Sequence, residues 1–197
     1  MTNLSFYKSK NLPEKHNHVE IVFLDFKVIY NDPRRFGFIK ILNNKKEFKV
    51  YFNKLGPEAI NSKFNAKYFD KKLKNKKKNI KNLLLDQKFV SGIGNIYANE
   101  ILFHCKINPN KQALKINYKE VKELVKFSKK VLFLAIKFGG SSIRDFKNIK
   151  GSMGKFQKEF KVYEKSNKIC PRAKCNGKII KTYISNRSTF FCKSCQK

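Results

Sequence analysis

Cys170-Pro-Arg-Ala-Lys-Cys175 and Cys192-Lys-Ser-Cys195 are two close cysteine pairs near the C-terminus of this 197-residue chain, and they contain four of its five cysteines. Two pairs at this separation are typical of a tetrahedral zinc site. The residues between them alternate as in a β-hairpin that turns near Ser185–Asn186, which puts Arg187 at or just past the tip. Two disulfides are the alternative, but nothing marks a secreted chain. Because four thiolates leave no open coordination position, the zinc ion is expected to be structural.

The charge of the chain points to a polyanionic partner. Its 45 Lys and Arg residues against 14 Asp and Glu give a formal net charge of +31, and 41% of its residues are hydrophobic, which disfavours disorder. Such an excess favours nucleic acid first and an anionic membrane surface second. The longest apolar run, Val131–Ile136, is too short to span a bilayer, and the N-terminus lacks the order of a signal peptide. We therefore expect a cytoplasmic protein that has no membrane partner.

The N-terminal region has the pattern of strands joined by polar turns. The turn Asn31-Asp-Pro-Arg-Arg-Phe-Gly37 places two arginines and an aromatic ring together. On a basic protein it indicates a finger that enters a nucleic-acid groove with Phe36 as an apolar wedge, although Phe36 could instead begin a core strand. His16 could contact a phosphate or be an ordinary surface histidine. Three stretches are predicted to be strands: Val19–Phe23, Val28–Tyr30 and Phe36–Leu42.

Helical patterns fill the middle of the chain after the break at Lys54-Leu-Gly-Pro-Glu58. Ser91-Gly-Ile-Gly-Asn95 leads into a helix, and its backbone N–H groups would bind a phosphate readily. Asn117-Tyr-Lys-Glu120 resembles a capping box that opens a long helix, which Gly139-Gly140 ends. These breaks predict three domains, at residues 1–61, 62–150 and 151–197.

Several motifs follow one another in the order found in the formamidopyrimidine-DNA glycosylase family, which the whole chain resembles along with the endonuclease VIII-like sister enzymes. The resemblance implies an α+β fold with part of a β-sandwich, a helix-two-turns-helix domain and a zinc-finger hairpin. The matches are Lys15-His-Asn-His18, Asn31-Asp-Pro-Arg-Arg-Phe-Gly37, Leu55-Gly-Pro-Glu58, Leu85-Asp-Gln87, Gly92-Ile-Gly-Asn-Ile-Tyr-Ala98, Gly139-Gly140 and Asn186-Arg-Ser-Thr-Phe-Phe-Cys-Lys-Ser-Cys-Gln196.

The resemblance also implies an activity and a partner. Family members remove oxidised purines from DNA and then cut the abasic site by elimination. The partner would be double-stranded DNA with a damaged base or an abasic site, bound by a monomer. Arg187 would take part in the second elimination step and, with Asn95, would grip the phosphates beside the lesion. The other DNA contacts implied are Arg34 in the place of the everted base, Phe36 and Met1 probing the base stack, and His16 and Lys76 on phosphates.

Two features depart from the family pattern. The first cysteine pair encloses four residues where two are common, which is still within zinc-ligand spacing. The family's nucleophile is an N-terminal proline, followed by a glutamate, and this chain begins Met1-Thr-Asn-Leu4 instead. We therefore expect a glycosylase fragment that is inactive alone. The alternatives are a non-catalytic binder of damaged DNA and, from another class, a zinc-ribbon protein that binds structured RNA.

Overall fold

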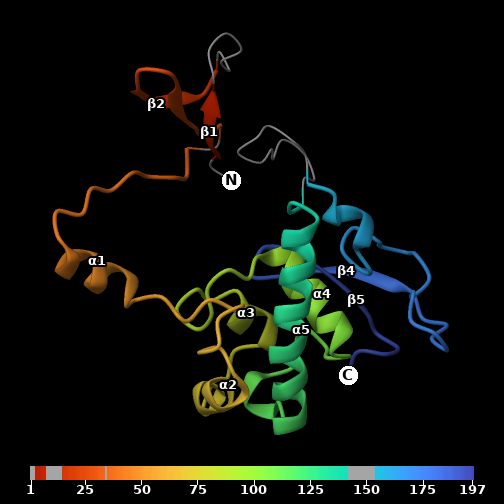
Figure 1. The fold of residues 1–197 in the computed structure, drawn as a ribbon. Coiled ribbons are helices and arrows are strands. Elements are labelled where there is room, and N and C mark those ends of the chain that lie inside the picture. The colour runs from red at the N-terminus through yellow and green to blue at the C-terminus, as the bar shows by residue number, and fades with distance from the viewer. Residues whose placement is uncertain (1–2, 8–14, 34, 142–153) are drawn as a thin grey trace. The chain divides into compact units, whose positions relative to one another are not determined.

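The computed structural model describes residues 3–7, 15–33, 35–141 and 154–197, with the side chains of 3–7 left aside. Helices and strands both occur, which confirms the α+β class predicted from the sequence (Figure 1). The chain separates into two compact units. One comprises Met1–Asn44 and Ala135–Glu159, and the other comprises Lys45–Leu134 and Phe160–Lys197. The three domains expected from the sequence stay a prediction.

The first unit contains a three-stranded antiparallel sheet in the order β1-β3-β2, formed by β1 (Asn3–Tyr7), β2 (Asn17–Val22) and β3 (Lys27–Asn31). A tight turn joins β2 to β3, with a 2.9 Å hydrogen bond from Phe23 N to Phe26 O and the two rings stacked 4.5 Å apart. Ile29 in the central strand is fully buried, while β2 leaves Ile21 half exposed. Strand β1 was not among the strands predicted from the sequence.

The strand expected at Phe36–Leu42 is absent from the structure, and that prediction is wrong. Its residues alternate as a strand should, yet Phe36 is 77% exposed and Ile41 is 81% exposed. A strand needs a neighbour to satisfy its backbone N–H and C=O groups, and no described strand pairs with this stretch. The helix α1 (Lys45–Phe52) that follows was likewise not expected from the sequence.

The second unit is built around helices whose ends are capped by asparagines. Asn65 Oδ1 accepts from Tyr68 N, and Asn79 Oδ1 accepts from Asn82 N at 2.8 Å. The capping box predicted at Asn117 is confirmed by reciprocal 2.9 Å bonds with Glu120. Besides α1, the helices in the described residues are α2 (Ala66–Leu73), α3 (Ile80–Leu84), α4 (Asn95–His104) and α5 (Tyr118–Lys137), with a 3₁₀ turn at Ala113–Lys115. A second 3₁₀ turn, Phe156–Glu159, belongs to the first unit.

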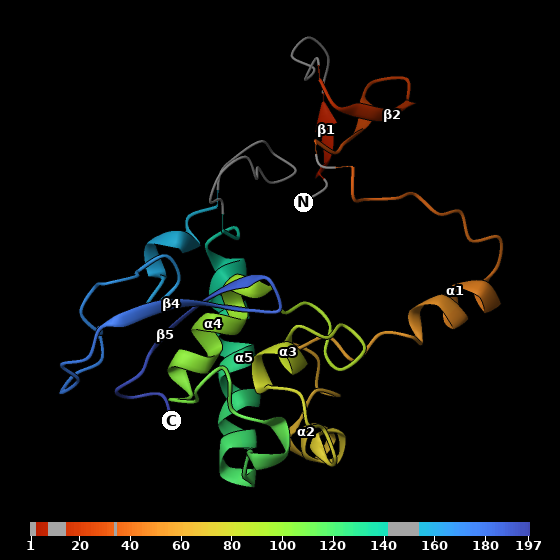
Figure 2. The same cartoon turned by 180° about the vertical axis from the view of Figure 1, so that it is seen from behind.

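Helix α4 is the central element of this unit. It lies between α5 and the hairpin formed by β4 (Ile179–Ile184) and β5 (Arg187–Cys192) in both views (Figures 1 and 2). Its middle residues are buried on every side, polar ones included: Ala98, Asn99, Glu100, Ile101, Leu102 and Phe103. Because no face of α4 is left to solvent along that stretch, its polar side chains must find partners within the protein.

The hairpin turns where the sequence predicted. Ile184 pairs with Arg187, and the two turn residues, Ser185 and Asn186, both have positive φ angles of 48° and 59°. Two left-handed residues in a two-residue loop are the geometry of a type I′ turn, which matches the twist of the strands. In the part of the chain that is described, no helix has the length and apolar character to cross a membrane.

Candidate metal centre and nucleic-acid interface

Four cysteine sulfurs form a compact cluster at the open end of the hairpin, opposite its turn. The Sγ atoms of Cys170, Cys175, Cys192 and Cys195 all lie within 4.8 Å of one another, and two pairs are 3.8 and 3.7 Å apart. Tetrahedral zinc with bonds of about 2.3 Å requires sulfurs about 3.8 Å apart, whereas a disulfide requires about 2.05 Å. All five cysteines are free in the described residues, so the two-disulfide alternative is wrong and the cluster fits a metal ion.

The backbone around the cluster brings the two cysteine pairs into contact. Cys170 N donates to Gly177 O at 2.8 Å. A Cβ on Gly177 would lie 2.3 Å from Ser194 Oγ and 2.8 Å from Cys192 Sγ, so only glycine fits there. Gln196 Oε1 accepts from Cys192 N at 2.9 Å, which ties the second cysteine pair to the end of the chain. The four residues between Cys170 and Cys175 therefore do not prevent the four sulfurs from gathering at one site.

Arg187 and Asn95, which the resemblance paired, are brought together at the other end of the hairpin. Arg187 is exposed beside the turn, and Asn95 is the first residue of α4. Asn95 Nδ2 donates to the carbonyl of Ser188, the residue after Arg187, at 3.0 Å. Its Oδ1 is buried and has no hydrogen-bond partner within the described residues. The N-terminus of α4 and the arginine thus share one small surface.

Lys81 also supports this surface, and the sequence reasoning missed it. Its fully buried Nζ donates to Ser188 O at 3.0 Å and to Thr189 Oγ1 at 2.7 Å. Burial, assisted by the charge of Arg187, lowers the pKa of Lys81 to about 8. The only sequence signal was a lysine in the apolar run Ile80-Lys-Asn-Leu-Leu84, which in so lysine-rich a chain reads as surface.

Two asparagines complete the attachment of the hairpin to the helices. Asn82 Nδ2 donates to Ser185 Oγ in the turn at 2.8 Å. Asn99 Oδ1 accepts from Phe190 N at 2.7 Å, while its Nδ2 donates back to Asn95 O at 2.6 Å. The position of the turn is therefore set by polar contacts from both α3 and α4.

Replacing Lys81 with Met is expected to leave the stability at pH 7 undiminished, because removing the buried charge offsets the loss of its hydrogen bonds. The methionine keeps the volume but removes two bonds to β5, each contributing about 1 kcal/mol. Because the folded-state pKa of Lys81 lies below its ordinary value of 10.5, the charged form is disfavoured in the fold. Below pH 8 the folded protein bears the whole free-energy cost of burying the charged ammonium. That cost falls as the pH rises from 8 to 10.5, because the buried amine loses its proton before the unfolded one does.

Denaturant unfolding of both proteins at pH 7 and pH 9.5 measures this dependence. The stability of the wild type relative to Lys81→Met should rise with pH. Lys67→Met, an exposed lysine of α2, is the matched control and should show no such trend. A constant difference between the wild type and Lys81→Met at both pH values would contradict the lowered pKa.

The other predicted DNA contacts are Lys76, His16, Phe36, Arg34 and Met1. Lys76 is exposed in the loop between α2 and α3. His16 and Phe36 are exposed and belong to the first unit. Arg34 and Met1 lie outside the described residues.

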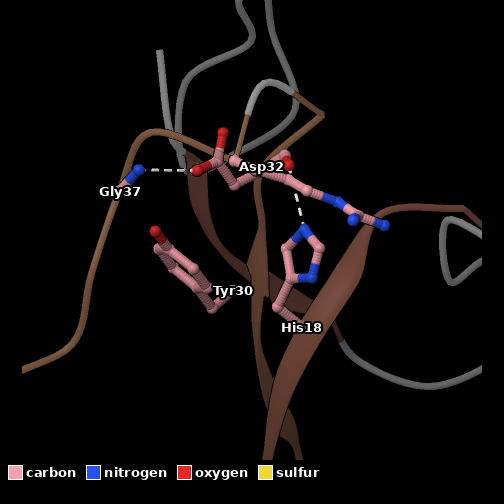
Figure 3. A pocket seen from close by; sticks show the side chains of 5 residues that line it. His18, Tyr30, Asp32 and Gly37 are labelled. Atoms are coloured by element: carbon pink, nitrogen blue, oxygen red, sulfur yellow. Dashed lines mark hydrogen bonds between the residues drawn. The ribbon is translucent and has the colours of Figure 1, made fainter.

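Within the first unit, Asp32 holds the Asn31–Gly37 turn in shape. Its buried carboxylate accepts from Gly37 N at 2.8 Å, and its carbonyl is 2.9 Å from the His18 ring (Figure 3). Asn31 Nδ2 donates to Lys15 O at 2.9 Å. The motif from Lys15 to His18 is therefore bonded to the turn that carries Phe36. His18, Tyr30, Asp32, Arg35 and Gly37 line a pocket here.

Comparison with known proteins decides the ancestry. Residues 55–147 match the model of the formamidopyrimidine-DNA glycosylase H2TH domain. Over 194 residues, 98% of this chain and 70% of the relative, the sequence is 42% identical to a formamidopyrimidine-DNA glycosylase of Wolbachia sp. subsp. Brugia malayi (strain TRS). The chain belongs to the formamidopyrimidine-DNA glycosylase family. It is also 42% identical to the enzyme so named from Neisseria meningitidis, of which it covers 66%.

Solved structures of the formamidopyrimidine-DNA glycosylase family have the same fold. The complex between the Lactococcus lactis Fpg and an abasic-site-containing DNA matches with a TM-score of 0.89 and 36% identity, covering 100% of this chain and 72% of that one. A structure of MutM with DNA containing carbocyclic 8-oxo-G matches with a TM-score of 0.87 and 35% identity, covering 100% and 71%. The chain covers between 66% and 72% of the length of these relatives.

Proposed function

We propose that the chain binds double-stranded DNA at a damaged base or an abasic site, as the base-excision repair glycosylases of its family do. The observation that carries this is the shared surface of Arg187 and Asn95, fixed by the bonds to Ser188 O. A phosphate can accept from the N–H groups in the first turn of α4, where the N-cap Gly94 has no side chain to occupy them.

Arg187 would contribute a planar guanidinium that binds phosphate with two parallel N–H donors, which lysine does not offer. Everting a base costs a few kcal/mol, and phosphate contacts on either side of the lesion offset that cost. Phe36 would occupy the space in the base stack from which the base is everted. Arg34 and Met1, which lie outside the described residues, would do the same. His16 and Lys76 would add sequence-independent phosphate contacts.

The metal ion proposed for the four-cysteine cluster is zinc. Four thiolates in tetrahedral spacing are the donor set of structural zinc sites. When bound, the ion would hold both cysteine pairs and so the base of the hairpin. Arg187, at the tip, belongs to the same hairpin and would take its position relative to DNA from that base.

Cleavage is the family's activity: excision of oxidised purines followed by elimination at the abasic site. We propose Arg187 as the residue of this chain that acts in the second elimination step. In the family the covalent step belongs to the amine of an N-terminal proline, a group that none of the DNA contacts proposed here supplies. We propose that these 197 residues, made as one polypeptide, bind abasic DNA without forming the covalent intermediate.

Borohydride trapping on abasic duplex DNA tests this. The polypeptide should give no more adduct than Lys-rich proteins give non-specifically, while an intact family member run beside it should be trapped efficiently. Efficient trapping of the 197-residue polypeptide would contradict the non-catalytic assignment.

Competition binding tests the proposed partner. A labelled duplex with a tetrahydrofuran abasic analogue should be displaced at least tenfold more readily by unlabelled abasic duplex than by undamaged duplex or by a structured RNA at equal salt. Preferential displacement by RNA would favour the zinc-ribbon alternative and overturn the proposal.

A further inference from the structure

Arg172 lies in the unusually long loop between the first two cysteines and contacts the helix behind the metal cluster. Its Nη2 donates to the carbonyl of Phe103, in the last turn of α4, and its guanidinium carbon is 4.7 Å from the centroid of the Phe103 ring. The Phe103 carbonyl also accepts from Lys106 N at 3.0 Å, and a cation at this end of a helix is favoured by the helix dipole. The first cysteine loop is thereby attached to α4.

The second cysteine pair is attached to the same end of α4 by the last two residues of the chain. Gln196 Nε2 donates to Ile107 O at 2.9 Å while its Oε1 accepts from Cys192 N. Lys197 N donates to Lys106 O at 3.0 Å, and Asn108 N donates to Lys197 O at 2.9 Å. Both cysteine pairs therefore depend on the segment in which α4 ends.

The two ends of α4 thus serve different parts of the hairpin. At the N-terminal end Asn95 and Asn99 bond the residues beside Arg187, and at the C-terminal end Phe103 bonds Arg172. A ten-residue helix is about 15 Å long and stiff. The helix therefore connects the cysteine loop to the residues that bond the hairpin near Arg187.

Arg172 has one donor to spare. Its Nε is buried and has no hydrogen-bond partner in the described residues. Once the cysteines hold a divalent ion as thiolates, the cluster carries a net charge of about −2, and sulfur becomes a good acceptor.

We propose that Arg172 is a positioning residue that joins the metal centre to the phosphate-binding surface, fastening the first cysteine loop to α4 and offering its buried, unpartnered Nε to the thiolates of the cluster. The part concerning DNA rests on the proposed function, whereas the part concerning the metal does not. Residues that bond metal ligands from outside the coordination sphere typically change metal affinity by about 10–100-fold.

The test compares the full 197-residue chain with Arg172→Gln, Arg172→Lys and Lys174→Gln. Lys174 lies in the same loop and is exposed, so its variant controls for the loss of one positive charge. Zinc release into excess chromogenic chelator, without DNA, should be at least about tenfold faster for Arg172→Gln. Arg172→Lys should be intermediate, because it restores the charge but not both bonds, and Lys174→Gln should match the wild type.

Two further readouts separate positioning from general destabilisation. In cobalt-substituted protein the thiolate-to-metal charge-transfer band should shift in Arg172→Gln and not in Lys174→Gln. With saturating zinc, Arg172→Gln should bind abasic duplex several-fold more weakly with an unchanged salt slope, because no phosphate contact is lost.

Wild-type zinc release and an unshifted cobalt band in Arg172→Gln would overturn the proposal. Equal acceleration in Lys174→Gln would overturn it as well. Failure of the wild type itself to prefer abasic DNA would overturn the proposed function and the DNA part of this inference, while the metal readouts would still decide the role of Arg172 at the cluster.

Discussion

Removing the metal ion from the four-cysteine cluster is expected to unfold the C-terminal hairpin and to abolish selective binding of abasic DNA. The hydrophobic core that the hairpin shares with α4 is small. Its buried residues are Phe103, Val162, Cys170, Ile179, Phe190 and Cys192, with Tyr163, Cys175 and Cys195 partly buried. A two-stranded hairpin with so little core is marginal in water. Structural zinc contributes about 10–16 kcal/mol of apparent binding free energy in small fingers, and here that energy would hold both cysteine pairs.

Amide hydrogen exchange before and after chelation measures the effect. Amides of β4 and β5 should lose protection by at least about 100-fold, while those in the middle of α5 stay protected because their helix has its own packed face, with Val121 and Leu124 buried. Cys192→Ser should reproduce the loss. Cys105→Ala, which removes a thiol outside the cluster, is the control and should retain the metal. Protection of the hairpin that survives chelation would contradict a structural role for the ion.

Replacing Glu100 with Ala is expected to destabilise the second unit by about 3–4 kcal/mol. The carboxylate is 2% exposed and accepts the backbone N–H groups of Lys161, Val162 and Tyr163 at 2.9, 3.0 and 2.9 Å. Hydrogen bonds to a charged group contribute about 1.5–3 kcal/mol each, less when they share one acceptor, and their loss leaves buried donors unsatisfied. The segment leading into the metal site would be released from α4.

Glu100→Gln is the matched variant. Burial raises the pKa of Glu100 and the three N–H bonds oppose that rise, so a neutral acceptor of the same shape should be tolerated better. Two of the N–H groups donate to Oε1, which the amide oxygen can replace, and the third would face the amide NH₂. Thermal unfolding should show a fall of about 10 °C for Glu100→Ala and about 3 °C for Glu100→Gln. Equal, small shifts would show that these bonds are not needed.

The parts of the fold that were predicted correctly are those that local chemistry decides. The cysteine cluster follows from ligand type and spacing, and the Ser185–Asn186 turn follows from residues that tolerate positive φ. The capping box at Asn117 is equally local. The family resemblance was also sound, because its motifs lie in order along the whole chain.

The parts that were missed depend on partners far away in the sequence. Nothing near Lys81 shows that its ammonium will meet β5, more than a hundred residues later, and Glu100 finds its donors beyond residue 160. Gln196 likewise bonds Ile107. At Phe36–Leu42 the sequence predicted an element that the structure lacks. The residues alternate as in a strand, but alternation does not supply a neighbouring strand.

A double-mutant cycle between Arg187 and Asn95 tests most directly the central claim that these residues form one phosphate-binding surface. Affinity for abasic-analogue duplex would be measured across salt concentrations for the wild type, Arg187→Ala, Asn95→Ala and the double variant, with Lys178→Ala as a charge-matched control far from the turn. Each single change at Arg187 or Asn95 should weaken binding by about 10–100-fold, and Arg187→Ala should lower the salt slope by about 1. The two effects should be non-additive by at least about 0.5 kcal/mol. Additive effects, or an Arg187→Ala protein that binds like the wild type, would contradict the claim.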